Sequence, residues 1–269
     1  MAGIWPGETQ CVAMLSFDVD GVSSWIRRNS DHARLPSLMS MAEYGPSVAT
    51  PRILDLLEDH GIKASFYIPG YVAETHPEMV KEIARRGHEI GHHGYMHEPP
   101  ATMDAKEEEE VLKRGIGILE DLVGERPTGY RSPSWELSEV SLELLAAYGF
   151  AYDTSLMGDD APYMVDTSRG PLVEIPTHWI LDDAPHFVYA PAAQRTSPMK
   201  SPNEIYEIWS AEFDGLYRYG RSFNLTMHPQ FIGRPGRLLM LERLIAYIRS
   251  YPNAPFMRLT DVAQMWAGR

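Results

Sequence analysis

The sequence predicts an α/β fold, a distorted (β/α) barrel of about seven parallel strands in which residues 1–269 form a single domain. Apolar segments of strand length alternate about seven times with segments of helical spacing, which is typical of parallel α/β proteins. The chain length of 269 residues suits one barrel-sized domain. Neither an internal repeat nor a low-complexity tract or linker divides the sequence.

Strands are expected where short apolar runs occur, because the sheet of such a protein is covered by helices and buried. The seven runs are residues 12–19, 63–68, 88–93, 128–134, 150–156, 172–180 and 222–229. Apolar residues at helical spacing predict helices at residues 48–61, 76–87, 105–124, 138–149, 201–220 and 238–251. A short strand at 255–259 and a helix at 261–268 are expected to end the fold.

Two segments, residues 21–45 and 157–171, interrupt this alternation. Connections of this length in a compact domain usually serve function or subunit contact, since a long structureless loop is otherwise uncommon. We therefore expect these two segments to cap the active site or to make contacts between subunits.

Composition narrows the possible partners and the compartment. The formal net charge of −13 argues against nucleic acid and anionic membranes, because an acidic surface repels phosphates, although a local basic patch could still exist. No run reaches the ~18–20 apolar residues that span a bilayer. The N-terminal residues lack the pattern of a signal peptide, and the single cysteine, Cys11, allows no intrachain disulfide. These features predict a cytoplasmic protein without nucleic-acid or membrane partners.

Ionisable residues follow the ends of five predicted strands. The carboxyl ends of barrel strands meet at one face, where active sites of such barrels lie. The residues concerned are Asp18 and Asp20, the histidines of residues 88–97, Arg131, Asp153 and His228. Each is weak evidence alone, but together they predict an active site at this face.

Four histidines lie within the ten residues from His88 to His97. His93 and His97 are four residues apart, so a helical turn would point both imidazoles the same way. With a carboxylate from Asp18 or Asp20 they would make a three-ligand metal site with room for water, as catalytic zinc requires. Taken alone, the histidine pair could be solvated or packed, and the Asp-x-Asp sequence could be a solvated turn.

Four segments together resemble the NodB-homology, or polysaccharide deacetylase, family. They are SFDVDG (16–21), GHEIGHHGYMH (87–97), RSPSW (131–135) and LTMH (225–228), in the order of the corresponding family motifs. The match spans nearly the whole chain, and the histidine-rich motif is highly specific. The resemblance implies a NodB-type barrel that hydrolyses carbon–nitrogen bonds other than peptide bonds, with deacetylation of an N-acetylated sugar or glycan as the expected activity.

The resemblance also implies a metal centre and a base. One divalent metal ion, for which zinc is favoured over cobalt, nickel or iron, would be bound by Asp20, His93 and His97. Asp18 corresponds to the base that activates water, and Arg131 to the arginine that orients this base.

Further roles follow from the same resemblance. His228 corresponds to the acid that protonates the leaving nitrogen, and Asp153 stands at the place of the aspartate that tunes this histidine. A backbone N–H near Ser134 would stabilise the oxyanion. We expect Trp135, and Trp25 from the first long connection, to contact the substrate.

The remaining histidines and tryptophans have other expected places. His92 stands where the family commonly has asparagine, so we expect it near the substrate or supporting the site indirectly. His88 is expected to make a structural hydrogen bond. Trp179, Trp209 and Trp266 are expected in the core or at an interface, because aromatic side chains are usually buried.

Three features depart from secreted polymer deacetylases. Val19 separates the two aspartates, Gly94 replaces the usual Ser or Thr, and no secretion signal is evident. Trp25, Arg27 and Arg28 could also narrow the pocket. These features resemble the branch that includes Helicobacter-type peptidoglycan deacetylases, cyclic imide hydrolases and allantoinases, and they imply a homo-oligomer, a dimer or tetramer.

Three functions are compatible with these features. The first is metal-dependent deacetylation of an N-acetylated sugar or short glycan. The second is hydrolysis of a small cyclic amide, imide or ureide at the same metal site, which the expected cytoplasmic location and capping segments favour. The third, a non-catalytic carbohydrate-binding or scaffold protein, is disfavoured because Asp18 and His228 are both present.

Overall fold

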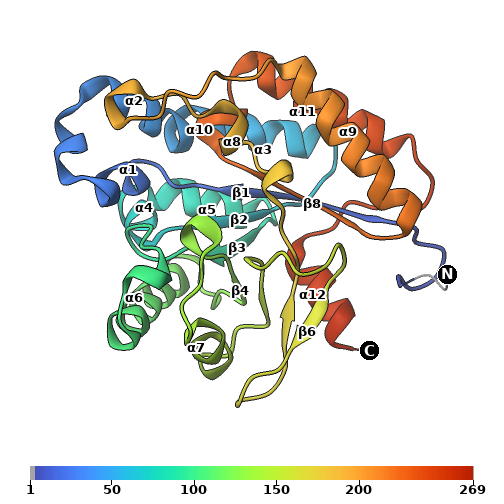
Figure 1. Cartoon of the computed structure of the whole chain (residues 1–269), viewed down its shortest axis with the longest axis horizontal. Coiled ribbons are helices and arrows are strands. Elements are labelled where there is room, and N and C mark those ends of the chain that lie inside the picture. The colour runs from blue at the N-terminus through green and yellow to red at the C-terminus, as the bar shows by residue number, and fades with distance from the viewer. Residues whose placement is uncertain (1–3, 269) are drawn as a thin grey trace.

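The computed structural model describes residues 4–268. These residues form an α/β fold around an eight-stranded sheet (Figure 1). The strand order is β6-β7-β5-β4-β3-β2-β1-β8, and every neighbouring pair is parallel except β6 and β7. The strands are β1 (Val12–Asp18), β2 (Ser65–Ile68), β3 (Glu89–His92), β4 (Gly129–Tyr130), β5 (Tyr152–Asp153), β6 (Tyr163–Val165), β7 (Leu172–Glu174) and β8 (Ser222–Met227). Residues 1–3 and Arg269 lie outside the described residues. The expectation that the N-terminus is not a signal peptide therefore falls in part on residues that the structure does not describe.

The predicted α/β fold with seven parallel strands is confirmed, and the sheet curls into a half-barrel that β8 and β6 leave open at its two edges. β6 is an additional antiparallel strand within the 157–171 connection, where a loop was expected. Its three residues are too few to show a periodic pattern in the sequence. The short strand expected at 255–259 is reduced to one bridge, between Ala13 and Phe256.

Helices cover both faces of the sheet, with α9 and α11 on one side and α6 and α7 on the other (Figure 1). The longer helices fall where the sequence predicts them. They are α3 (Thr50–Asp59), α5 (Pro77–Arg85), α6 (Ala105–Val123), α7 (Ser141–Ala147), α9 (Pro202–Tyr219), α11 (Pro235–Arg249) and α12 (Leu259–Ala267). The 21–45 connection is largely helical, because it holds α1 (Ser23–Arg28) and α2 (Pro36–Tyr44).

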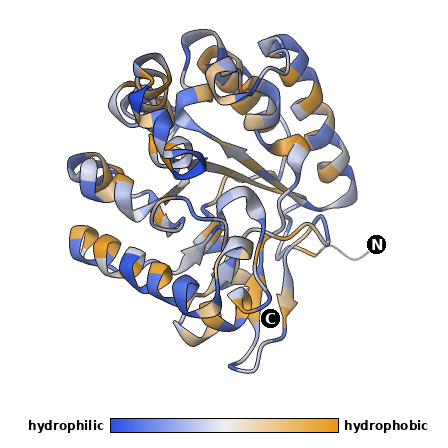
Figure 2. Ribbon diagram, turned by 60° about the vertical axis from the view of Figure 1, so that its left-hand side comes forward, coloured by the Kyte–Doolittle hydropathy of each residue, from blue (hydrophilic) through white to orange (hydrophobic). Residues whose placement is uncertain are grey.

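Local sequence signals fix the ends of α6. The Asp104 side chain accepts hydrogen bonds from the first-turn backbone, and Glu107 reaches back to the backbone of Asp104. Gly124 ends the helix in the left-handed conformation that glycine adopts without strain. The outer helices carry both hydrophobic and hydrophilic residues (Figure 2), as expected where one face packs on the sheet.

β1 lies next to the edge strand β8, and all seven of its residues are buried. It pairs with β2 on one side and β8 on the other, with Asp18 opposite Tyr67 and Phe17 opposite Met227. The carboxyl ends of β1, β3, β4 and β8 therefore face the same end of the sheet. Within residues 4–268, no helix is both long and apolar enough to cross a membrane.

Candidate active site

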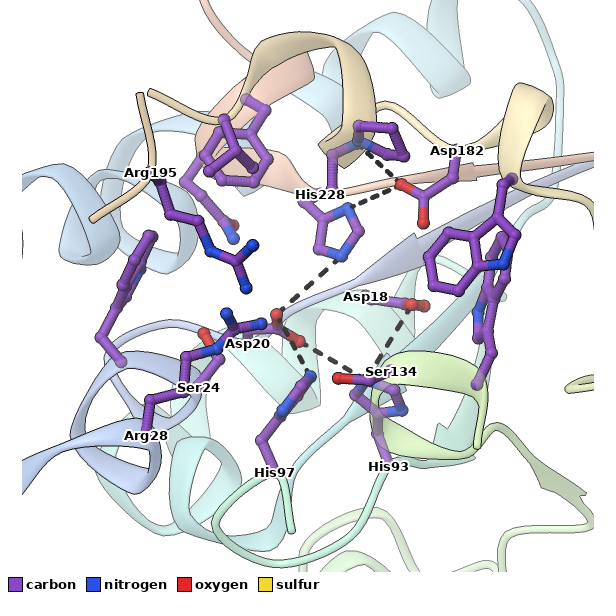
Figure 3. A pocket seen from close by; sticks show the side chains of 18 of the residues that line it. Asp18, Asp20, Ser24, Arg28, His93, His97, Ser134, Asp182, Arg195 and His228 are labelled. Carbon is purple, nitrogen blue, oxygen red and sulfur yellow. Dashed lines mark hydrogen bonds and ion pairs between the residues drawn. The ribbon is translucent and has the colours of Figure 1, made fainter. Parts of the chain in front are cut away.

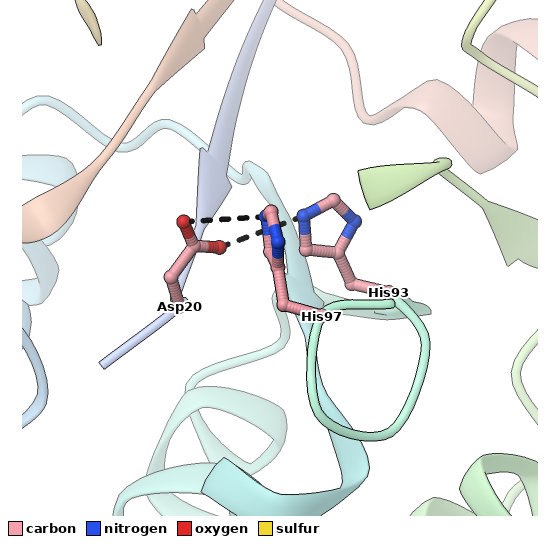
Figure 4. A group of neighbouring side chains, drawn as sticks. All are labelled: Asp20, His93 and His97. Carbon is pink, nitrogen blue, oxygen red and sulfur yellow. Dashed lines mark ion pairs between the residues drawn. The ribbon is translucent and has the colours of Figure 1, made fainter. Parts of the chain in front are cut away.

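Asp20, His93 and His97 form a compact cluster at the carboxyl ends of β1 and β3 (Figure 4). The Nε2 atom of His93 lies 3.5 Å from Asp20 Oδ1, and the Nε2 atom of His97 lies 3.5 Å from Asp20 Oδ2. All three side chains are buried. The arrangement offers two nitrogens and one carboxylate to a common point.

A tight turn, and not the helical turn that the sequence suggests, brings the two histidines together. Gly94 has a φ of +73° and His97 a φ of +62°, so both residues adopt the left-handed region. Glu98 accepts hydrogen bonds from the backbone N–H groups of Tyr95 and Met96, which closes the turn. A Cβ at position 94 would lie 3.2 Å from the Pro133 ring. Glycine in place of Ser or Thr is thus suited to this turn.

The electrostatics of the cluster fit a cation. Burial alone would raise the pKa of Asp20, but the neighbouring histidines hold it below its usual value. Burial lowers the pKa of His97 to about 4, so its imidazole is neutral at pH 7 and has a lone pair to offer. His93 Nδ1 donates to the Arg131 carbonyl at 2.8 Å, which leaves Nε2 free toward Asp20. Asp20 Oδ1 is buried and accepts no hydrogen bond from residues 4–268. This donor set fits a divalent metal ion.

Asp18 lies beside this cluster and forms a buried ion pair with Arg131. Arg131 Nη1 donates to Asp18 Oδ1 at 2.7 Å, and Asp18 Oδ2 lies 3.9 Å from His93 Nε2. The guanidinium is fully buried and stacks over the Tyr67 ring, with 4.2 Å between Cζ and the ring centroid. Arg131 therefore holds Asp18 with one oxygen engaged and the other facing the cluster.

His228, at the end of β8, faces the cluster from the opposite side. Its Nε2 lies 3.9 Å from Asp20 Oδ2, and its Nδ1 lies 2.7 Å from Asp183 Oδ1. Burial alone would lower the pKa of His228, but the carboxylates of Asp183, Asp182 and Asp20 raise it well above its usual value. These carboxylates therefore favour the imidazolium form of His228, with Nδ1 donating to Asp183 and Nε2 facing the cluster.

The carboxylate that contacts His228 is Asp183, and the expectation for Asp153 is corrected. Asp153 Oδ1 accepts from Ser155 at 2.8 Å, and its carboxyl group lies against Glu174 on the neighbouring strand. Burial raises the pKa of both carboxyls, as expected for two acids that share a proton. Asp153 is therefore part of a buried acid pair and does not touch His228.

Asp182 and Asp183 form with His228 a second group that could in principle bind a metal. However, Asp183 already accepts the Nδ1 proton and the backbone N–H of His228, the latter at 3.0 Å to each carboxylate oxygen. A protonated imidazole offers no lone pair to a metal. We interpret this group as an ion pair that positions His228.

These side chains surround a cavity of about 380 Å³ (Figure 3). Of the predicted site residues, eight line it together: Asp18, Asp20, Trp25, His93, His97, Ser134, Trp135 and His228. Arg131 is buried behind Asp18. Ser134 and Trp135 have φ values of 61° and 59°, and strained backbone of this kind is typical of functional sites.

The similarity to known proteins agrees with this geometry. The family described as Polysaccharide deacetylase matches residues 33–152. The peptidoglycan deacetylase of Helicobacter pylori is 35% identical over 273 residues, which cover 91% of this chain and 92% of that protein. The chain belongs to the polysaccharide deacetylase family. It is thus an enzyme that hydrolyses carbon–nitrogen bonds other than peptide bonds.

Solved structures extend the similarity of this polysaccharide deacetylase family member. A polysaccharide deacetylase structure from Mycobacterium smegmatis is 37% identical, has a TM-score of 0.96 and covers 100% of this chain and 94% of that chain. An allantoinase is 26% identical, with a TM-score of 0.85 over 98% of this chain and 93% of that chain. Both similarities cover nearly the whole fold.

His92 and His88 lie outside the pocket of this family member. His92 is fully buried, with Nε2 3.2 Å from the Leu112 carbonyl, and its ring packs closely on Gly115 of α6. It does not contact the substrate cavity, so the substrate-binding expectation for His92 is wrong. His88 Nδ1 accepts from the Ala64 N–H at 3.1 Å, which confirms the structural hydrogen bond.

The walls of the pocket differ in part from the prediction. The first long connection contributes Ser24, Trp25 and Arg28, whereas the 157–171 connection contributes nothing to the cavity. The other wall comes from residues 179–197, including Trp179, which was expected in the core or at an interface. Trp179 is 46% exposed and stacks on Trp135, with 4.4 Å between ring centroids. Trp209 is buried as expected.

Sequence reasoning missed Asp182, Asp183 and Arg195. The two acids follow the apolar Trp179–Leu181 turn, and adjacent acids after a strand-and-turn segment were a usable signal. Asp182 bridges to Thr226 in parallel fashion, which brings the acid pair alongside the end of β8. Arg195 had no such signal, because it lies in an irregular segment.

Proposed function

We propose that this enzyme is a metal-dependent amidohydrolase that removes the acetyl group from an N-acetylated sugar or short glycan. The observation that carries the proposal is the grouping of a base, an acid and a metal-binding triad around one cavity. Asp18 is held by Arg131, His228 is held by Asp183, and the two face each other across Asp20. The family membership supports the same reaction.

Asp20, His93 and His97 would hold one divalent ion, for which zinc is favoured by its preference for nitrogen and carboxylate ligands. When bound, the ion would supply Lewis acidity, which lowers the pKa of water and polarises a carbonyl oxygen.

Asp18 would act as the general base. Its Oδ1 is occupied by Arg131, so Oδ2 is the oxygen that can accept a proton from water. The water oxygen then bonds to the acyl carbon. Ser134 lines the cavity, and its backbone N–H could stabilise the oxyanion that develops, whereas the N–H of Trp135 already donates to the Ser132 carbonyl.

His228 would act as the general acid. The leaving nitrogen must gain a proton before the carbon–nitrogen bond breaks, because an amide anion is a poor leaving group. His228 Nε2 carries that proton, and Asp183 stabilises the imidazolium and fixes its orientation. The products are a free amine and a carboxylic acid. Water supplies the hydroxyl group that the acyl carbon gains and the hydrogen that the nitrogen gains.

The second candidate is hydrolysis of a small cyclic amide, imide or ureide by the same residues. The cavity of about 380 Å³ is small, since α1 and residues 179–197 narrow it, and such a volume suits a compact ligand. The overall similarity to an allantoinase also supports this candidate.

One experiment separates the two candidates. Zinc-reconstituted protein is assayed for acetate release from short N-acetylglucosamine oligomers and, in parallel, for ring opening of succinimide. Acetate release alone supports the deacetylase. Ring opening without acetate release assigns the enzyme to the small cyclic substrates. Hydrolysis of neither substrate, with zinc bound, would contradict the proposed activity on these classes.

We further propose that the protein is a homo-oligomer, a dimer or tetramer. Large apolar side chains of the segment beside the pocket are exposed, namely Trp179, Tyr189 and Met199, and exposed groups of this kind often mark interfaces. A monomeric profile in sedimentation velocity would contradict this. Cytoplasmic localisation stays a prediction from the sequence.

A further inference from the structure

Two arginines line the same side of the active-site cavity. Arg28 is the last residue of α1, and Arg195 belongs to the 179–197 wall. Figure 3 shows both guanidinium groups on one side of Asp20, with Asp18 and Asp182 on the other side. The cavity thus has a cationic side, an acidic side and the metal-binding cluster between them.

Both arginines are anchored by the backbone. Arg195 and Ala190 exchange two backbone hydrogen bonds, at 2.7 and 3.1 Å, which close a short hairpin. Arg28 stands in a helix that continues through the backbone bond from Asn29 to the Trp25 carbonyl. The placement of the two side chains at the cavity therefore follows from the fold and not from an unrestrained loop.

The two guanidinium groups lack partners within the described chain. Neither forms a hydrogen bond or an ion pair with any residue of 4–268, in contrast to Arg131, which is bonded to Asp18. Partial burial and the like charge of Arg195 lower the pKa of Arg28, and the charge of Asp20 only partly offsets this. Two like charges on one wall, with no protein anion between them, leave a place for an anionic group.

We propose that Arg28 and Arg195 bind a carboxylate carried by the substrate itself, beside the bond that is hydrolysed. This inference rests on the proposed function and narrows it to amides, imides or ureides that bear an acidic group. A planar guanidinium matches a carboxylate through paired N–H donors. In a chain of net charge −13, this local pair also supplies the attraction that the surface as a whole lacks.

A carboxylate is favoured over a larger anion because the cavity must also hold the scissile group. Its volume of about 380 Å³ suits a single substituted ring, with its acyl group at Asp20 and a short acidic substituent at the arginines. A phosphate presents similar chemistry to arginine, so the experiment includes one as a separate probe.

Binding is measured by titration calorimetry on the full chain, independently of turnover. The probes are N-acetylglucosamine, N-acetylmuramic acid, which adds a carboxylate to the same sugar, and N-acetylglucosamine 6-phosphate. Hydantoin and hydantoin-5-acetic acid form the matched pair for the cyclic substrate class. We expect one carboxylate probe to bind about tenfold or more tighter than its neutral partner, since a charged hydrogen bond has about this effect.

The variants are Arg28→Gln, Arg195→Gln and the double variant, with Arg27→Gln as the matched control. Arg27 belongs to the same helix but does not line the cavity. The first three should remove the preference for the carboxylate in steps and leave binding of the neutral probe unchanged. The Arg27→Gln control should keep the preference for the carboxylate. Equal Tm values would confirm that all variants fold.

Three results would overturn the inference: equal binding of acid and neutral probes, a preference that survives the double variant, or tighter binding of the phosphate than of either carboxylate. Absence of all binding up to about 10 mM would overturn it too, because charged pairs at such a site predict tighter association. If the carboxylate preference holds but neither matched pair is hydrolysed, the proposed function falls while the anion site stands.

Discussion

Arg131 and Asp18 meet as a buried ion pair, with 2.7 Å between Nη1 and Oδ1 and almost no solvent exposure of either side chain. The pair joins the ends of two strands that lie three places apart in the sheet, since Asp18 ends β1 and Arg131 follows β4. A buried charge of this kind is stable only with its partner. The ion pair should therefore both stabilise the fold and orient Asp18 as the base.

The Asp18→Asn variant should lose at least about a hundredfold in turnover, because the general base is removed while its shape is kept. Zinc content, measured by atomic emission, should stay at that of the wild type, since Asp20, His93 and His97 are untouched. Unchanged turnover would refute the assignment of the base.

The Arg131→Met variant should behave differently from Asp18→Asn. It leaves the Asp18 carboxylate buried without its partner, which typically costs about 3–5 kcal/mol of the free energy of unfolding. Urea denaturation should show this loss, and turnover should fall as well. A variant that is inactive but as stable as the wild type would show that the ion pair of Arg131 with Asp18 does not stabilise the fold.

Metal binding should depend on His93 and not on its neighbour His92. His93→Asn removes one of three ligands, so zinc retained after dialysis should fall well below one ion per chain. His92→Asn removes a ring that contacts α6 and Tyr130 but does not reach Asp20, so zinc should be retained.

Chelation of the wild type should abolish turnover and lower its Tm, because bound metal stabilises the folded state. Full zinc content in His93→Asn would exclude this triad as the metal site.

The fold and most of the site could be predicted because their signals are local. Each strand end carries its ionisable residue within a few positions, so topology alone brings Asp18, Asp20, His93 and His228 to one face. The segment from 178 to 201 lacks such periodicity. The adjacent acids Asp182 and Asp183 mark the segment in the sequence, but their place beside β8 depends on the bridge between Asp182 and Thr226, which no sequence pattern predicts.

The case of Asp153 shows the same limit in one residue. The sequence predicts its place at a strand end correctly, because Asp153 is the last residue of β5. It does not predict the direction of the carboxyl group, which contacts Ser155 and Glu174 and not His228. A motif gives the position of a side chain along the chain, whereas its partner is decided by packing.

Substitution of Asp183 should therefore matter more than that of Asp153. In Asp183→Asn the charge that raises the pKa of His228 is lost, so this pKa falls. The acid is active when protonated, and activity is lost as the pH rises through its pKa. The alkaline limb of the kcat profile should thus move to lower pH, with kcat reduced about tenfold or more at neutral pH. Asp153→Asn, as the matched control, should keep the wild-type profile. The reverse pattern would restore Asp153 as the partner of His228.

The buried His88 side chain, which lies away from the active site, should make the free energy of unfolding depend on pH. Burial lowers the pKa of His88 to about 4, from 6.5 as the ordinary value. The unfolded chain thus binds a proton at this residue more readily than the folded chain, so the free energy of unfolding falls as the pH drops below the unfolded value. Between pH 7 and pH 5 this group should lower the free energy of unfolding by about 1 kcal/mol, since solvent screening reduces the full effect of the shift.

The His88→Asn variant tests this expectation directly. The amide oxygen of asparagine can accept the Ala64 N–H in place of Nδ1, while the titrating group is gone. Urea denaturation of both proteins at pH 7 and pH 5 should show the wild type losing about 1 kcal/mol more than the variant over this interval. Equal losses would mean that His88 titrates alike in both states. A larger loss in the variant would reverse the sign and contradict the buried, neutral histidine that directly precedes β3.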